Sequence, residues 1–231
     1  MTAGSLNRNQ LKYLAVAAML LDHIAWAFVP TVSPAGQLMH AVGRLTAPVM
    51  LYFLAEGYVH TRSVGRYAGR LFLFTLISWV PCSLFDTGAW PAPYFGMLFT
   101  MLLGLAAILV WDRSGMSLPG KTAVTLGLCA LSLFGDWPVL GVLWPLGFCL
   151  LREDEWKKWG FYLVSAGAFC LIVLLTLGPR QLFQLGVFLA PPLLRCYNGE
   201  AGSRAPFHRW FFYLFYPAHL LLLWLLKSVW G

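Results

Sequence analysis

The sequence predicts an all-α integral membrane protein, a bundle of about nine transmembrane helices whose amino terminus is cytoplasmic. Hydrophobic residues make up 59% of the 231 positions and charged residues only 11%, whereas a soluble domain is about 25% charged. The mean hydropathy is +0.70. Eleven Trp and nine Tyr residues suit a chain with two membrane interfaces, where amphipathic rings are favoured. We expect residues 1–231 to form one transmembrane domain.

Apolar runs separated by Pro, Gly and charged residues define the expected helices, several of them shorter than the roughly 20 residues that usually cross a bilayer. The first run is longer than the apolar part of a signal peptide and precedes no small-residue cleavage site, so it is expected to remain as a helix. The two shortest runs are separated by a tight turn or form a re-entrant hairpin. The expected spans are 11–30, 38–60, 70–85, 95–111, 121–135, 138–151, 159–178, 181–195 and 209–229.

The distribution of Lys and Arg predicts the orientation, because positively charged residues collect on the cytoplasmic side. With the amino terminus inside, only Arg180 and Lys227 lie outside, and Arg44 lies within a span. An odd number of spans preserves this asymmetry. We therefore expect a multi-pass membrane protein with the lipid bilayer as its main partner.

Several functional classes find no support in the sequence. The net charge of +7 comes from basic residues that stand one to three at a time, so a nucleic-acid-binding patch is not expected. The five Cys residues show no C-x-x-C spacing and the His residues no H-x-x-x-H spacing, so no metal site is expected. Glycine-rich phosphate loops and the G-x-S-x-G hydrolase motif are also missing.

Ionisable residues within the apolar helices are the candidate functional residues, because such groups are costly in a bilayer. Asp22 and His23 lie in the first span, Arg44 in the second and His219 in the last. At about 1.5 Å per residue, His23 lies ~16 Å from Lys12, and His219 lies ~15 Å above the inner end of its helix. Arg44 lies ~12 Å below the outer face. All reach the midplane, so the first, second and last spans are expected to surround one polar site.

Asp22 and His23 project about 100° apart on their helix and must serve different partners. Arg44 is the natural bidentate partner for Asp22. His23 is then available as a general base, with His219 as a second base, an oxyanion donor or an orienting group. A structural ion pair and an interhelical histidine hydrogen bond are the alternatives without catalysis.

The remaining candidates are expected to be structural. His40 and His60 lie near span ends and His208 near the inner interface, so we expect these three to be interfacial. Glu56 is expected to neutralise neighbouring Arg or Lys side chains near the inner end of the second span.

Three segments resemble the TraX family, membrane proteins associated with acetylation of the pilin subunit in conjugation. They are LKYLAVAAMLLDHIAWAF, GRLTAPVMLYFLAEGYVHTRS and FFYLFYPAHLLLLWLL, and the resemblance covers nearly the whole chain. The family is similar in plan to larger multi-pass acyltransferases, in which a basic residue precedes an intramembrane histidine by eleven positions, as Lys12 precedes His23. The most specific positions are Lys12, Asp22, His23, Gly43, Arg44, Pro48, Gly57, Arg62, Tyr216 and His219.

The resemblance implies a protein of the bacterial inner membrane that transfers acetyl from cytoplasmic acetyl-CoA. The acceptor would be an amine or hydroxyl of a pilin-like amino terminus or another envelope acceptor. His23, with Asp22, Arg44 and His219, would form the catalytic site. The phosphates of CoA would meet cations at the inner surface, namely Lys12, Arg62, Arg66, Arg70 and Arg209.

Two other functions remain open. Mid-membrane Asp and His residues are also typical of proton-coupled transporters, although the halves of this chain lack the internal symmetry that is common in that class. A non-enzymatic assembly protein for a pilus or conjugation apparatus would need the polar residues for packing only.

Overall fold

Helices form nearly all of the regular structure in the computed structural model, which describes residues 4–230. The chain divides into two compact units. The described residues of the first unit are 4–50 and 159–230, and the second unit comprises Leu51–Lys158. Two helices cross the boundary, because α3 (Thr46–His60) begins in the first unit and α8 (Glu155–Leu177) begins in the second.

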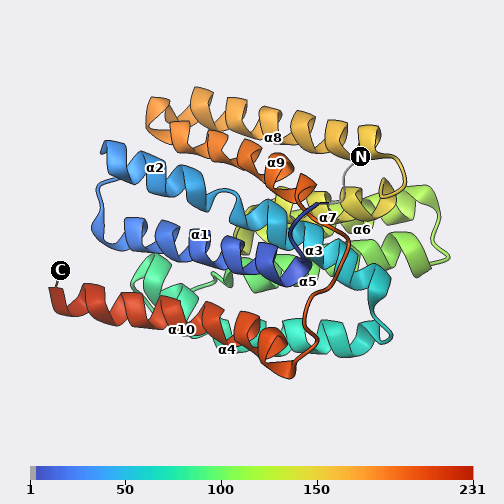
Figure 1. The fold of residues 1–231 in the computed structure, drawn as a ribbon, viewed down its shortest axis with the longest axis horizontal. Coiled ribbons are helices and arrows are strands. Elements are labelled where there is room, and N and C mark those ends of the chain that lie inside the picture. The colour runs from blue at the N-terminus through green and yellow to red at the C-terminus, as the bar shows by residue number, and fades with distance from the viewer. Residues whose placement is uncertain (1–3, 231) are drawn as a thin grey trace. The chain divides into compact units, whose positions relative to one another are not determined.

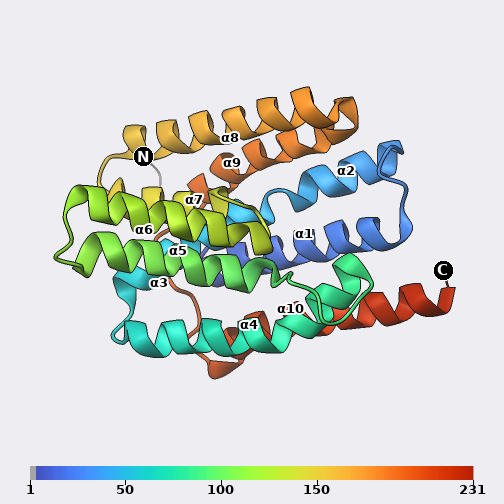
Figure 2. The ribbon, with the colours of Figure 1, turned by 180° about the vertical axis from the view of Figure 1, so that it is seen from behind.

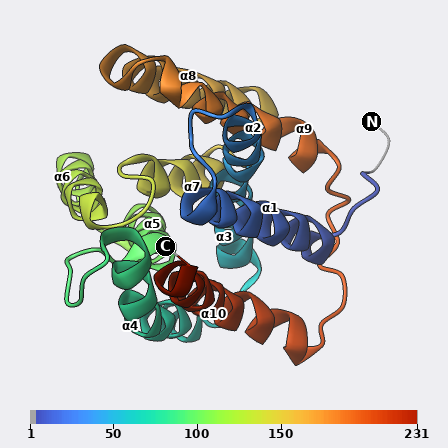
Figure 3. The same ribbon diagram turned by 90° about the vertical axis from the view of Figure 1, so that its left-hand side faces the viewer.

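In the first unit, α1 lies between α2 and α10, which Figures 1 and 3 show from two directions. Besides most of α8, this unit holds α1 (Arg8–Phe28), α2 (Pro34–Gly43), the 3₁₀ segment η2 (Pro179–Leu189), α9 (Ala190–Arg195) and α10 (Pro206–Trp230).

Local capping explains where α1 and α2 begin. The Asn7 side chain accepts a hydrogen bond from the Gln10 backbone N–H at 3.1 Å, and the Gln10 side chain accepts from the Asn7 N–H at 2.9 Å. This capping box satisfies two amides at the start of α1. Ser33 caps α2 by accepting from Gly36 N–H at 3.0 Å, and Pro34 occupies the first helical position, where its missing N–H costs nothing.

The first and last helices of the first unit run in the same direction. Near their starts, Lys12 Nζ lies 3.9 Å from the centre of the Phe212 ring, and Asn9 Nδ2 donates to the Ser203 carbonyl at 2.7 Å. About two helical turns further along α10 and three along α1, His219 meets His23. Figure 1 shows this parallel arrangement of α1 and α10.

In the second unit, α5 packs against α4, α6 and α7, and Figure 2 shows it between α4 and α6. Its glycines permit close approach, because a Cβ on Gly104 would lie 2.7 Å from Pro145 Cγ. Besides most of α3, this unit holds α4 (Val64–Thr87), α5 (Gly96–Arg113), α6 (Leu118–Leu131), the short 3₁₀ segment η1 (Ser132–Phe134) and α7 (Leu140–Leu150).

A partly buried tyrosine joins two loops of the second unit. The Tyr94 hydroxyl, just before α5, donates to Asp136 Oδ1 in the loop before α7. Burial, followed by the charge of Asp136, raises the pKa of the Tyr94 phenol above its ordinary value. Tyr94 therefore remains protonated and keeps its role as donor in neutral and moderately basic solution.

Six helices among the described residues are long and apolar enough to cross a membrane, so the expected count of about nine is not confirmed. The segments predicted at 121–135 and 138–151 form shorter apolar helices, Leu118–Phe134 and Leu140–Leu150. The candidate spans are Arg8–Phe28, Pro34–His60, Val64–Thr87, Gly96–Arg113, Glu155–Leu177 and Pro206–Val229.

The segment predicted as a span at 181–195 is not one continuous α-helix. It forms η2 and the six-residue helix α9. The proline pair at the start of α9, Pro191 and Pro192, lacks the N–H groups that α-helical bonds to η2 would need. The segment instead packs on α2, where a Cβ on Gly186 would overlap the carbonyl of Ala41.

We expect Gly186→Ala to destabilise the protein by about 1–3 kcal/mol, the usual cost of overpacking, because the new methyl group would collide with backbone rather than with a flexible side chain. Thermal unfolding in detergent measures the effect. Gly167→Ala on α8 is the matched control, since a Cβ there meets nothing within 4 Å. Equal melting temperatures for the two variants would show that η2 does not pack tightly against α2.

Candidate functional site

Asp22 is the centre of a buried polar cluster between α1 and α2. Its Oδ1 accepts a hydrogen bond from His40 Nδ1 at 2.7 Å, and its Oδ2 accepts from an Arg44 guanidinium nitrogen. The Asp22 side chain is 8% exposed, that of Arg44 14%, and His40 is completely buried. The Asp22 carboxylate therefore lies between two donors, His40 within α2 and Arg44 directly after it.

A glycine permits this contact. Gly43 ends α2 directly opposite Asp22, and a Cβ at this position would overlap the Asp22 side chain. Arg44 follows as the helix cap, with φ −60° and ψ −22°, and the chain turns before α3. The break between α2 and α3 thus positions Arg44 beside the carboxylate.

Aromatic side chains cover the cluster. The centre of the His40 ring lies 4.2 Å from that of Trp26 on α1 and 5.0 Å from that of Phe183 on η2. The guanidinium carbon of Arg44 lies 5.5 Å from the centre of the Phe183 ring. Apolar surroundings strengthen the electrostatic attraction within the cluster.

A second polar contact joins α1 to α10. His219 Nε2 lies 3.2 Å from His23 Nδ1, and the ring centres are 4.9 Å apart with the rings inclined at 64°. His219 is 4% exposed, whereas His23 is only partly buried. Because Asp22 faces α2 and His23 faces α10, the neighbouring residues serve different partners.

Backbone carbonyls determine which ring nitrogens carry hydrogen. His23 Nδ1 lies 2.8 Å from the Met19 carbonyl oxygen, and His219 Nδ1 lies 2.8 Å from that of Phe215. A carbonyl only accepts, so both Nδ1 atoms are donors. The His23 N–H is then shared between Met19 and the Nε2 lone pair of His219, and the basic nitrogen of neutral His23 is Nε2.

These contacts confirm three predictions made from the sequence. The first, second and last predicted spans do supply one polar region, Asp22 pairs with Arg44, and His23 meets His219. The prediction of a bidentate Asp22–Arg44 pair was wrong, because the carboxylate divides its oxygens between Arg44 and His40.

The assignment of His40 to the membrane interface was also wrong. This residue is 0% exposed and is a direct partner of Asp22. The signal was present in the sequence, because His40 precedes Arg44 by four positions and residues spaced by four share a helix face. An Arg44 that faces Asp22 therefore predicts a His40 one turn away on the same face.

The other predicted structural residues lie outside this cluster. His60 is exposed and lies 3.4 Å from Glu56, so Glu56 has a histidine rather than Arg or Lys as its ion-pair partner. His208 Nδ1 lies 2.8 Å from the Tyr13 hydroxyl oxygen, with which it forms a hydrogen bond. Across residues 4–230, no three His, Cys, Asp or Glu side chains are grouped in a way that could hold a metal ion.

The cations predicted to meet CoA belong to both units. Lys12 and Arg209 lie in the first unit together with the two histidines, while Arg62, Arg66 and Arg70 lie in the second. Lys12 packs on Phe212 of α10, and Arg209 is exposed three residues before that phenylalanine. Only Lys12 and Arg209 are thus placed on the same helices as His23 and His219.

The chain is similar to a known protein family and to a named protein. The profile of the family described as "TraX protein" matches residues 7–227. The chain is 32% identical over 234 residues to the "Probable fimbrial assembly protein FimC, serogroup H1" of Dichelobacter nodosus, and the similarity covers 93% of each chain. No solved structure matches this chain.

Proposed function

Because the chain belongs to the TraX family, we propose that it is a membrane-embedded acetyltransferase that moves acetyl from cytoplasmic acetyl-CoA to an amine or hydroxyl. The acceptor would be a pilin-like amino terminus or another envelope component. The printed name of the relative from Dichelobacter nodosus, a fimbrial assembly protein, supports a role connected with pili. The six long apolar helices support a membrane location, and we propose the bacterial inner membrane.

The observation that carries the proposal is the contact between His23 and His219. Two imidazoles 3.2 Å apart in apolar helices are an expensive arrangement unless they exchange protons or bind a polar group. His23 has a hydrogen-bonded Nδ1 and a basic Nε2, and its partial exposure gives it access to a substrate. These are the properties of a general base. The hydrogen bond from Nδ1 holds the imidazole ring in position.

The acyl transfer then uses residues of the first unit. Nε2 of His23 removes the proton from the acceptor amine or hydroxyl. A lone pair of the acceptor nitrogen or oxygen attacks the thioester carbonyl carbon. The C–N or C–O bond forms first and gives a tetrahedral oxyanion. The C–S bond breaks when this intermediate collapses, and the proton passes from His23 to the leaving thiolate. Met19 and His219 accept the hydrogen on Nδ1, which stabilises the imidazolium that forms between these steps.

Arg44 and His219 are the two candidates for stabilising the tetrahedral oxyanion. Arg44 carries a permanent charge but binds Asp22. His219 touches His23 directly but uses Nε2 as an acceptor in the arrangement described above. We therefore assign His219 to positioning His23, and Arg44 with Asp22 to the electrostatic environment of the site.

The residues at the starts of α1 and α10 suit the acyl donor. CoA carries phosphates, and both Lys12 and Arg209 offer cations on the helices that carry the two histidines. Lys12 precedes His23 by eleven positions, a rise of ~16 Å along a helix. The long, narrow pantetheine arm of CoA would lie along the contact between α1 and α10, from these cations to His23.

An acetyl-transfer assay tests the proposal directly. Purified protein in nanodiscs would receive isotopically labelled acetyl-CoA and envelope fractions, and mass spectrometry would search for an acetyl mass increase that requires the protein. We also expect acetyl-CoA to raise the melting temperature, because a ligand that binds the folded state stabilises it. If no labelled product forms and acetyl-CoA gives no stabilisation, the proposal is wrong.

A non-enzymatic role in fimbrial assembly is the second candidate, and the name of the relative favours it. In that case the midplane residues would serve packing only, and His23→Gln, which keeps size and hydrogen bonding, would support normal pilus assembly. An acetyltransferase that needs His23 as a base would lose function in the same variant.

A further inference from the structure

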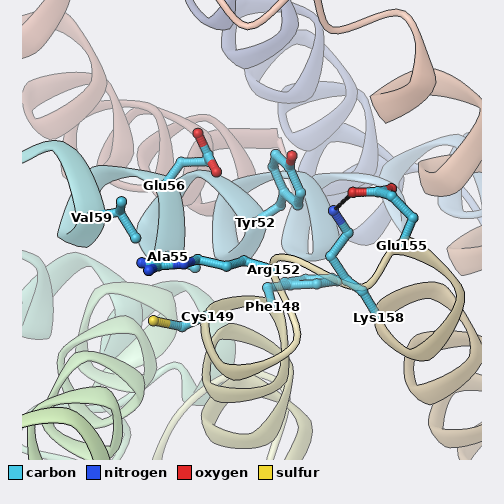
Figure 4. Close-up of a pocket in the computed structure, with 9 residues that line it drawn as sticks. All are labelled: Tyr52, Ala55, Glu56, Val59, Phe148, Cys149, Arg152, Glu155 and Lys158. Carbon is cyan, nitrogen blue, oxygen red and sulfur yellow. Dashed lines mark hydrogen bonds and ion pairs between the residues drawn. The ribbon is translucent and has the colours of Figure 1, made fainter. Parts of the chain in front are cut away.

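A charged pocket in the second unit is lined by residues that the proposed acetyl transfer does not use. It has a volume of about 190 Å³ and lies between α3, the end of α7 and the start of α8. Figure 4 shows Glu56 of α3 above the side chain of Arg152, which extends toward α3 from the turn after α7. Glu155 and Lys158 line the other side and contact each other.

The four charged side chains sum to zero but are not all neutralised by each other. Lys158 pairs with Glu155 and lies 5.7 Å from the centre of the Tyr52 ring, with its side chain only 6% exposed. Arg152 pairs with Glu153 at 3.5 Å, and Glu56 with His60 at 3.4 Å. Within the described chain, no ion pair joins Glu56 to Arg152, so opposite charges border one cavity without meeting across it.

The pocket lies at the ends of two candidate membrane spans. The span Pro34–His60 ends one turn after Glu56, and the span Glu155–Leu177 begins with a residue of the pocket. Trp156, beside Glu155, is 91% exposed, and exposed Trp side chains are enriched at the headgroup level of a bilayer. The cavity is therefore at the depth where lipid headgroups lie.

Size and charge limit the ligand. A cavity of about 190 Å³ is smaller than the roughly 300 Å³ or more of pockets for drug-sized molecules, so it fits a headgroup rather than a nucleotide. A guanidinium suits a phosphate, to which it can make paired hydrogen bonds. A carboxylate such as Glu56 suits an ammonium group, and two acidic side chains disfavour a ligand with only negative charge.

We propose that this pocket binds a phosphate–ammonium group, the chemistry of phosphoethanolamine, with Arg152 and Lys158 facing the phosphate and Glu56 facing the ammonium. Because the pocket lies at headgroup depth, we expect the membrane lipid phosphatidylethanolamine to supply this group. A choline headgroup has the same charges but no N–H to donate to Glu56. The site thus selects ethanolamine over choline, and this inference does not depend on the acyl-transfer activity.

Native mass spectrometry of the full-length protein tests the site. Protein released from nanodiscs that contain equal fractions of dioleoyl phosphatidylethanolamine, phosphatidylcholine and phosphatidylglycerol should retain one phosphatidylethanolamine preferentially. Arg152→Gln should weaken its apparent affinity about tenfold or more, the usual effect of losing a charged hydrogen bond. Glu56→Gln should remove the preference for ethanolamine over choline while phosphate binding persists.

Two matched variants control for charge. Lys157→Gln removes a cation beside Lys158 that pairs with Asp154 and does not line the pocket. Glu200→Gln removes an exposed carboxylate in the first unit. Both should retain the lipid as the unmodified protein does, and circular dichroism and size-exclusion chromatography verify that all variants are folded.

Soluble phosphoethanolamine distinguishes the two sources of this chemistry. If it stabilises the protein in detergent at concentrations where the lipid does not, the pocket binds the free compound. That result would support the phosphate–ammonium chemistry but overturn the lipid as its source. Equal retention of all three lipids by the unmodified protein, or equal losses in Arg152→Gln and Lys157→Gln, would overturn the proposal.

Discussion

Replacing His23 with Ala is expected to reduce acetyl transfer by roughly 10²–10⁴-fold, the usual contribution of a general base, and thus to near the background rate. The side chain is partly exposed and contacts His219 from α1, so its loss removes little core packing, and the protein should remain inserted and folded. Labelled-acetyl incorporation into the acceptor, measured with thermal unfolding of the same preparation, checks both statements.

His60→Ala is the matched control for this variant. His60 is an exposed histidine at the end of α3 whose ion-pair partner is Glu56, and its replacement should leave acetyl transfer unchanged. His219→Gln should lower the turnover rate and alter its pH profile without changing the KM for acetyl-CoA, since we assign this residue to positioning His23 rather than to binding the donor. Undiminished transfer by the His23→Ala protein would refute the catalytic assignment.

Asp22→Asn is expected to have the largest effect on stability. The change keeps the shape of the side chain but leaves the Arg44 guanidinium, 14% exposed, without a carboxylate. Removing one partner of a buried ion pair costs about 3–5 kcal/mol, because the other charge stays buried. The free energy of unfolding in bicelles, measured by denaturant titration, gives the size of this cost.

The double variant Asp22→Asn/Arg44→Gln separates the ion pair from simple packing. It removes both charges, so it should recover at least half of the stability that Asp22→Asn alone loses. Glu153→Gln is the control on the protein surface, because that carboxylate also pairs with an arginine but is 87% exposed, and it should change stability little. If the single and double Asp22 variants unfold alike, Arg44 gains nothing from Asp22.

The helical class could be predicted because apolar runs long enough to cross a bilayer must satisfy their backbone groups internally. The break at Arg44 was harder to predict. Residues 38–60 are predicted as one span, yet α2 ends at Gly43 and α3 begins at Thr46. The close approach of α1 at Asp22 requires the glycine there, and periodicity along one segment carries no information about a neighbour's position.

The segment 181–195 is predicted as a span but forms η2 and the short helix α9. Its composition is apolar enough to resemble a span, but Pro191 and Pro192 interrupt α-helical bonding. Phe183 of this segment packs against His40 and so helps to bury the Asp22 cluster. Such a role depends on a contact between segments more than 140 positions apart, which the sequence of either segment does not reveal.

The sequence by itself determined that this is a helical membrane protein and that Asp22, His23, Arg44 and His219 are its unusual residues, because the cost of a charge in hydrocarbon depends only on residue type and depth. Tertiary structure alone decided how these residues are partnered. It divided Asp22 between Arg44 and the buried His40, and it placed His219 against His23. The physical reason is that hydrogen bonds between helices require rotation and register to be fixed, and packing between distant segments fixes both.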